Sequence, residues 1–213
     1  MSMKKIVRDF ILALFAGLCI GVGGTMYLTL ENKIAGSVFF SFGLIALLVF
    51  GFNLYTGKVG YILTNKPSYL IEVFVTWVGN LAGTYLFAVL VRQTRIFKTI
   101  QEHAVPLVEK KQNDNLMSLF ILGIFCGLLM FIAVDTFKKY YQTQGFLCVY
   151  LAVFCVVVFI LSGYEHCVAD MYYFALADKL GACFVPLVVI TIGNTIGGSL
   201  ITAAQLINKK LED

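Results

Sequence analysis

The sequence is poor in charged residues. Only 13% of its 213 residues are Asp, Glu, Lys or Arg, and 60% are hydrophobic, whereas about 25% charge is usual in a soluble domain. With a mean hydropathy of +0.87, this composition excludes an ordinary water-soluble globule and favours an integral membrane protein. Proline is also scarce, with three residues, and no low-complexity linker divides the chain. We therefore expect one transmembrane transport domain over residues 1–213.

Several chemical signatures are missing as well. The six cysteines show no C-x-x-C spacing, so packing within helices explains them better than metal binding. The chain has no H-E-x-x-H, no G-x-S-x-G and no paired acid and base beside a nucleophile. We therefore expect neither an enzyme nor a cofactor. The net charge of +4 lies scattered at the ends of apolar segments, a pattern that does not indicate nucleic-acid binding.

Six apolar stretches are long enough to cross a bilayer as helices, which takes about 20 residues. They are 10–30, 34–61, 69–91, 116–137, 146–176 and 180–207. The first is too long for the apolar core of a cleavable signal peptide, so we expect it to remain as a membrane span. Polar residues interrupt the second stretch at 53–58 and the fifth at 163–170. The interrupted backbone must be surrounded by protein, because lipid offers it no hydrogen bonds.

The two halves of the chain, about 1–98 and 110–213, resemble each other. Residues 78–83 read V-G-N-L-A-G and residues 192–197 read I-G-N-T-I-G. The first interruption, shifted along the sequence by the spacing between these two motifs, falls within the second interruption. Three spans in each half give the halves opposite orientations, and matching broken helices in inverted halves indicate a transport site within the membrane. The termini and short loops on the membrane side of the N-terminus hold more Lys and Arg than the short loops on the opposite side. Such residues are enriched on the cytoplasmic side of a membrane, so we expect both termini in the cytoplasm.

The second interruption places Glu165, His166 and Asp170 between apolar segments. Ionisable groups at this depth are rare and usually face a pathway or a protein-lined cavity. We assign His166 to the pathway. We assign Glu165, about 100° away on a helix, to holding the broken backbone or a neighbouring helix. Asp170 follows His166 by one helical turn, so we expect it to hold the imidazole in one tautomer. A histidine buried for structural reasons alone is the alternative.

These residues carry a resemblance to a known family. Residues 162–171, S-G-Y-E-H-C-V-A-D-M, and 191–198, T-I-G-N-T-I-G-G, resemble the two signatures of the formate/nitrite transporter family, and L-Y-T at 54–56 is similar to its Leu-Phe-Thr loop. The resemblance extends over all six apolar stretches. It implies an all-α protein with six transmembrane helices in two inverted three-helix repeats, an aquaporin-like arrangement and broken second and fifth helices. It also implies a homopentamer, with one pore in each protomer, in the plasma (inner) membrane of the cell.

The resemblance implies roles for individual residues. His166 would be the central pore histidine, with Thr56 and Asn194 as polar companions and Lys111 as a cation at the entrance. The apolar constrictions on either side would be formed by Phe40, Leu44, Leu54 and Phe159, with Tyr55 in place of the family's commoner phenylalanine. The family passes small monovalent anions of weak acids: formate, nitrite, acetate, lactate or hydrosulfide.

The sequence also departs from the family pattern. Asp170 stands where the family usually has asparagine, Gly127 stands where it often has asparagine, and the Gly57-Lys58 pair is not the formate channel's version. The choice of anion therefore stays open. Formate is our first expectation, and hydrosulfide, nitrite, acetate or lactate is the alternative.

An anion in an apolar constriction faces a desolvation cost of several kcal/mol or more. A weak acid escapes this cost by taking a proton and crossing in its neutral form. We expect Lys111 to concentrate the anion and His166 to supply or relay the proton. The alternatives are an anion channel with a charged His166, a pore for neutral solutes and a structural scaffold. None of the prolines follows an asparagine, unlike the paired Asn-Pro-Ala loops of water and glycerol pores.

Overall fold

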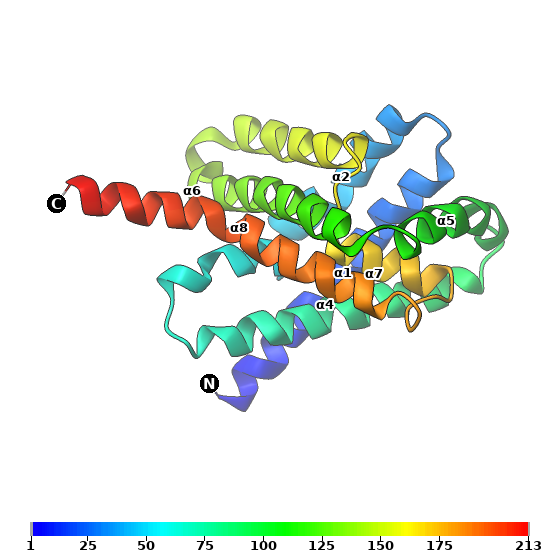
Figure 1. Ribbon diagram of the computed structural model, residues 1–213, viewed down its shortest axis with the longest axis horizontal. Helices are drawn as coiled ribbons and strands as arrows, with labels where there is room; N and C mark the ends of the chain where they lie inside the picture. The colour runs from blue at the N-terminus through cyan, green and yellow to red at the C-terminus, as the bar shows by residue number, and fades with distance from the viewer. Residues whose placement is uncertain (1, 213) are drawn as a thin grey trace.

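The computed structural model describes residues 2–212, which fold into helices without a strand (Figure 1). The elements are α1 (Met3–Thr29), α2 (Lys33–Val49), α3 (Tyr55–Lys58), the 3-10 helix η1 (Val59–Thr64), α4 (Tyr69–Arg92), α5 (Phe97–Gln112), α6 (Leu116–Leu161), α7 (Cys167–Leu176) and α8 (Phe184–Glu212). The prediction of an all-α protein is confirmed. Residues 1 and 213, the predicted limits of the domain, lie outside the described part.

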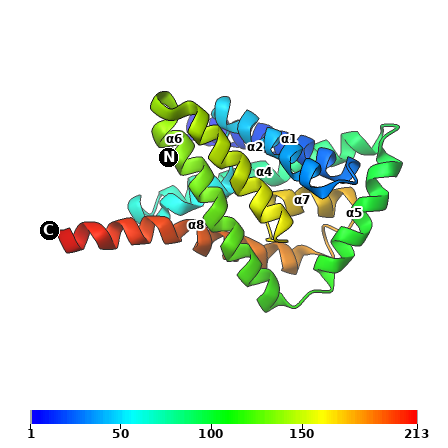
Figure 2. The same cartoon turned by 90° about the horizontal axis from the view of Figure 1, so that it is seen from above.

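Four helices, α1, α4, α6 and α8, are long and apolar enough to cross a membrane, whereas α2 and α7 are apolar but shorter. The two short helices belong to the segments that polar residues interrupt. Helix α6 leaves helical geometry at Gln144, with φ −137° and ψ 41°, and the chain turns back there (Figures 1 and 2). This bend separates the predicted fourth and fifth apolar stretches.

The start of α1 and the end of α8 lie toward the same end of the molecule, and α5 lies at the opposite end (Figures 1 and 2). The bend at Gln144 is found at the end that holds the termini. Large apolar side chains cover much of the outer surface, among them Phe39, Phe42, Phe74 and Phe146. Such a surface is unusual for a soluble monomer, and it fits a protein that lipid or other subunits surround.

Helix α1 packs against α4, and α6 packs against α8. Glycine makes both contacts close. A Cβ atom at Gly83 would collide with the carbonyl oxygen of Leu14, and one at Gly197 would collide with that of Ile124. Membrane helices gain little from the hydrophobic effect when they associate, so small residues that allow such approach are a common means of packing. Gly127 is equally tight, because a Cβ atom there would meet the backbone of Asn194. This contact explains the absence of an asparagine at position 127.

We predict that Gly197→Ala destabilises the protein. The added methyl group would push α8 away from α6, and overpacking of this kind costs about 1–3 kcal/mol. The measurement is the unfolding temperature of the purified protein in detergent. Gly181→Ala is the control, because a Cβ atom at Gly181 has no neighbour within 4 Å. Equal unfolding temperatures for the two variants would contradict the close packing of α6 and α8.

Candidate functional site

Both interruptions predicted from the sequence are breaks between helices, and both begin in the same way. Gly51 follows α2 with φ +68°, and Gly163 follows α6 with φ +70°. This left-handed conformation suits glycine, which ends many helices. The amides of Phe52 and Tyr164 then donate back to the carbonyl oxygens of Leu47 and Phe159, at 2.8 and 2.9 Å. Each break is thus a regular helix ending of the Schellman type, and it redirects the chain into the protein.

An asparagine from α4 holds the first break together. Asn80, fully buried, donates from Nδ2 to the carbonyl oxygen of Asn53 at 2.9 Å and to that of Ala13 at 2.8 Å. Its Oδ1 accepts the backbone N–H of Tyr55 at 2.8 Å. Asn80 therefore pairs the backbone groups on either side of Leu54, which would otherwise be buried without partners.

Asn194 of α8 does the same at the second break. Its Nδ2 donates to the carbonyl oxygens of Gly123 and Glu165, both at 2.8 Å, and its Oδ1 accepts the backbone N–H of Cys167 at 2.9 Å. The backbone groups on either side of His166 are thereby paired. Both amide donors of Asn194 are used in this way. The expected place of Asn194 in the solute pathway stays a prediction, and in the structure its amide binds the backbone of the break.

The central predicted residues, His166 and Thr56, meet at the point where the two breaks approach each other. His166 is 2% exposed and Thr56 is fully buried, and His166 Nε2 lies 3.1 Å from Thr56 Oγ1. The backbone N–H of Ala169 donates to His166 Nδ1 at 3.3 Å, which makes the imidazole the N-cap of α7. A nitrogen that accepts this bond carries no proton. The hydrogen-bond pattern therefore assigns a neutral imidazole whose Nε2–H donates to Thr56.

Asp170 does not hold the imidazole, which corrects the prediction from helical spacing. Its Oδ1 contacts Lys111 Nζ at 2.9 Å, and the partners of the imidazole are Thr56 and the Ala169 amide. Asp170 does lie one helical turn after His166, since its N–H donates to the carbonyl oxygen of His166 at 2.9 Å. Its side chain turns to the cation instead of to the histidine.

The predicted apolar residues are all buried around this point. The rings of Phe40 and Phe159 pack edge to face with centroids 5.8 Å apart, and the Phe159 ring lies 5.6 Å from the imidazole. Leu44 lies one turn along α2 from Phe40 and is 1% exposed. Leu54 precedes α3 and is 2% exposed. The structure thus brings these residues together with the histidine, whereas their role as a constriction stays a prediction.

Tyr55 uses its extra hydroxyl group for packing between the halves of the chain. The hydroxyl lies 2.7 Å from Thr195 Oγ1 of α8. The ring is 6% exposed. This hydrogen bond satisfies a polar group that phenylalanine, the commoner residue in the family's loop, does not carry. Tyr55 therefore ties α3 to α8.

Two cavities lie toward opposite ends of the molecule. The α3 cavity, of about 550 Å³, is lined by residues that include Leu54, Lys58, Tyr61, Tyr69 and Glu72, and it reaches the segment of α6 just before its bend. The α5 cavity, of about 280 Å³, is lined by residues that include Lys111, Phe159, Glu165, Asp170 and Tyr173. Leu54 reaches the first cavity and Phe159 the second, so the two chain breaks separate them.

Lys111 lines the α5 cavity, but its charge is not free. It is 8% exposed, and its ammonium contacts the carboxylates of both Glu165 and Asp170. Burial would lower the pKa of Lys111, but the two carboxylates raise it above its usual range. Lys111 therefore keeps its proton, and the neighbouring carboxylates balance its positive charge. The role of Lys111 as a cation at the entrance stays a prediction, and the structure shows that two carboxylates pair with its charge. This contact also joins Glu165 to the neighbouring helix α5.

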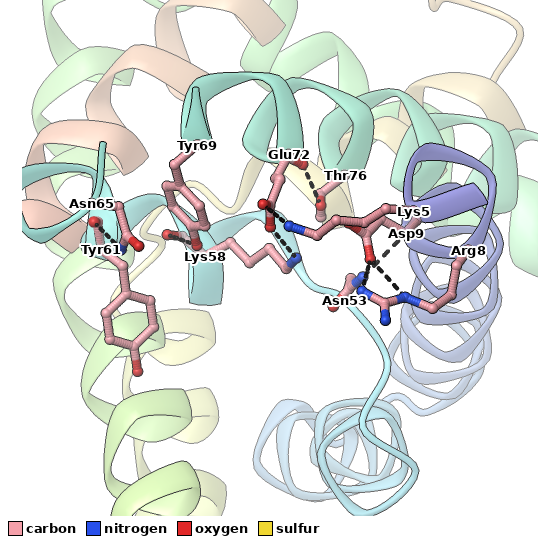
Figure 3. A network of polar contacts seen from close by, with 10 residues as sticks. All are labelled: Lys5, Arg8, Asp9, Asn53, Lys58, Tyr61, Asn65, Tyr69, Glu72 and Thr76. Carbon is pink, nitrogen blue, oxygen red and sulfur yellow. Dashed lines mark hydrogen bonds and ion pairs between the residues drawn. The ribbon is translucent and has the colours of Figure 1, made fainter. Parts of the chain in front are cut away.

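A polar network borders the α3 cavity (Figure 3). Glu72 of α4 contacts the ammonium of Lys5 and lies 3.8 Å from that of Lys58. Tyr69 donates to the carbonyl oxygen of Lys58 at 3.0 Å. The network joins α1, α3 and α4 at this mouth and keeps Lys58 beside the cavity.

The sequence could have identified Asn80, which was not among the predicted site residues. Asn80 lies in the V-G-N-L-A-G motif that matches the motif around Asn194, and the two side chains form equivalent hydrogen bonds. The separation between Asn80 and Asn53 is 27 residues, and that between Asn194 and Glu165 is 29. A repeated Gly-Asn in helices that follow a break was thus the signal for both bridges.

Comparison with known proteins identifies the family of this chain. A sequence model of the formate/nitrite transporter family matches residues 2–207. The chain belongs to the formate/nitrite transporter family. That family consists of transport channels and not of enzymes, in agreement with the sequence analysis.

Relatives in the formate/nitrite transporter family cover most of the chain. Nitrite transporter NirC of Salmonella typhimurium is 29% identical, over 86% of this chain and 76% of its own. Formate channel FocA of Escherichia coli is 24% identical, over 94% and 85%. A solved structure described as a pentameric formate channel with formate bound has a TM-score of 0.88 at 23% identity and covers 99% of this chain and 100% of its own. That likeness shows the fold.

We predict that Asn194→Ala disrupts the second break. It would leave buried backbone groups of Gly123, Glu165 and Cys167 without their partner, at a cost of about 1–3 kcal/mol for each group. The expected result is a large fall in the unfolding temperature in detergent, or loss of folded protein. Asn208→Ala is the control, because Asn208 is exposed and bonds only to Glu212 within the described residues. An Asn194→Ala protein as stable as the control would contradict the bridging role.

Proposed function

We propose that the protein is a channel for small monovalent anions of weak acids, with its path leading from one cavity to the other past His166. The observation that carries this proposal is the hydrogen bond between His166 and Thr56. It joins the two chain breaks at a polar point beside the Phe40 and Phe159 rings. Leu44 and Leu54 complete the apolar surroundings. Formate is our first choice of solute, because a relative named as a formate channel, FocA of Escherichia coli, matches 94% of this chain.

Nitrite is the second candidate solute. The NirC relative has 29% identity to this chain, against 24% for FocA. Hydrosulfide, acetate and lactate share the same chemistry, because each is a small monovalent base that becomes neutral on taking one proton. A direct test is a liposome assay that measures the uptake of each anion at two pH values. Uptake of formate or nitrite alone would identify the solute, and uptake of none would refute the channel.

We further propose that the anion crosses the apolar region as the neutral acid. Bringing a bare anion there would cost several kcal/mol or more, whereas the neutral acid avoids most of this cost. On this mechanism the anion binds a proton in one cavity, passes His166 and releases the proton in the other. Both nitrogens of His166 already take part in hydrogen bonds. His166 therefore donates its Nε2–H to Thr56 and to the passing solute in turn, and the proton that neutralises the anion is stored elsewhere.

A channel with a permanently charged His166 is the competing mechanism. It requires a proton on His166 Nδ1, but this nitrogen accepts a hydrogen bond from the backbone N–H of Ala169 at 3.3 Å. An imidazolium would have to give up this bond, and it would lie beside the positive end of the α7 dipole. This geometry favours the neutral imidazole.

For the whole protein, we propose six membrane crossings in two inverted repeats, with halves of about 1–98 and 110–213 in a single domain and an aquaporin-like arrangement. The equivalent endings at Gly51 and Gly163 and the equivalent bridges of Asn80 and Asn194 support this reading. We propose a homopentamer in the plasma membrane with both termini in the cytoplasm. The pentamer is supported by the pentameric structural relative, and lipid would surround it.

We predict that His166→Asn lowers proton-coupled formate uptake by at least about tenfold, because the solute would lose the hydrogen-bond donor that His166 positions between the two cavities. The measurement is initial uptake into liposomes at several pH values. His103→Asn is the control, since His103 of α5 lines neither cavity and bonds through Nδ1 to the carbonyl oxygen of Leu28 at 2.6 Å. Normal pH-dependent uptake of formate and acetate by a folded His166→Asn protein would refute the role of His166.

A further inference from the structure

The buried charges around Lys111 do not balance. Its ammonium contacts the carboxylate of Glu165 and, at 2.9 Å, that of Asp170. Glu165 is 6% exposed and Asp170 is 1% exposed. If both carboxylates were ionised, the cluster would carry one uncompensated negative charge, and burying an unpaired charge is strongly unfavourable. It would also repel an anion that enters the α5 cavity, which Glu165 and Asp170 line.

The surrounding groups do not supply a second positive charge. His166, next to Glu165, is neutral by its hydrogen bonds. Arg92 of α4 bonds to the carbonyl oxygens of Ala175 and Leu176, at the other end of α7. The other titratable groups near the cluster are Tyr27 of α1, Lys110 of α5, Asp114, Cys126 of α6, Cys167 and Tyr173 of α7. Lys110 is exposed, and within residues 2–212 no ion pair joins it to Glu165 or Asp170.

One oxygen of this cluster has room for a proton. Asp170 Oδ1 contacts Lys111, whereas Asp170 Oδ2 is buried and has no hydrogen-bond partner in residues 2–212. The carboxylates of Glu165 and Asp170 contact the same ammonium and therefore lie close to each other. Two like charges held at one site disfavour each other's ionisation. A single proton on one of the two carboxylates would remove the excess charge.

We propose that Glu165 and Asp170 together hold one proton at neutral pH, and that this carboxyl pair is the acid that protonates the anion in the α5 cavity. The second part rests on the proposed function. In the step, the O–H bond of the carboxylic acid breaks and an O–H bond forms on the anion, which leaves as the neutral acid toward His166. The pair is left with two carboxylates around Lys111. It then regains its proton from water in the cavity.

The stored proton depends on Asp170. With asparagine at this position, Lys111 and Glu165 would form a balanced pair of charges that needs no proton. In this chain, Asp170 adds a second carboxylate to the same ammonium. The acid is therefore a property of this sequence, and Asp170→Asn removes it with little change in shape.

Infrared spectroscopy of the purified protein in lipid tests the proton without any transport. The wild-type protein at neutral pH is expected to show the C=O stretch of a protonated carboxylic acid, and both Asp170→Asn and Glu165→Gln are expected to lose it. Asp135→Asn is the matched control and keeps the band, because Asp135 pairs with one ammonium, that of Lys139, at 2.8 Å. Absence of the band in the wild-type protein, or its persistence in either of the first two variants, would overturn the stored proton.

Uptake by the same proteins tests the acid. Asp170→Asn is expected to take up formate roughly tenfold more slowly than the wild-type protein at about pH 8, and this deficit should shrink toward about pH 5, where solution supplies more neutral acid. A deficit that is equal at all pH values, or absent, would overturn the acid role. If the wild-type protein moves no anion at all, the proposed function fails, and the infrared band still decides whether the proton is present.

Discussion

Two asparagine side chains allow this apolar protein to contain two broken helices. At each break, backbone groups turn away from regular helical bonding in a place where water and lipid offer no replacement. Asn80 and Asn194 each supply two donors and one acceptor to these groups. The residues between the bridged groups, Leu54 and His166, are consequently held in extended conformations. These bridges hold the two residues between which the candidate site is built.

The breaks create a local environment that differs from the rest of the interior. His166 caps the N-terminus of α7, where the helix dipole places partial positive charge. That field disfavours an imidazolium and favours a solute that carries negative charge or presents an acceptor. The rings of Phe40 and Phe159 limit the hydration of such a solute. A site with this balance attracts a weak-acid anion but favours its neutral form for passage. The uncharged imidazole and the apolar rings thus both favour passage of the solute in its neutral form.

Much of this arrangement could be predicted from the sequence, because the fold leaves local marks in it. Polar residues within apolar stretches marked both breaks, and His166 and Thr56 do meet there. The repeated Gly-Asn motif marked the equivalent helices but not the target of the asparagine amides. That target depends on backbone groups that come close only through the packing of α1 with α4 and of α6 with α8.

Charge pairing was harder to predict than helix breaks. Lys111 lies 54 residues before Glu165, and nothing in the local pattern places α5 over the start of α7. Helical spacing correctly put Asp170 one turn after His166, but it could not choose between the imidazole and a cation from another helix. Gly127 illustrates the same limit, since its contact with the Asn194 backbone exists only in the packed structure. Long-range contacts determined each of these outcomes.

The central claim is that the solute passes His166 without net charge. Solute uptake and electrical current measured together, on the same liposomes containing the purified protein, test it most directly. The account predicts formate uptake accompanied by an equal uptake of protons, with no net current and no dependence on membrane voltage. Uptake that carries one negative charge per anion and follows the applied voltage would contradict it.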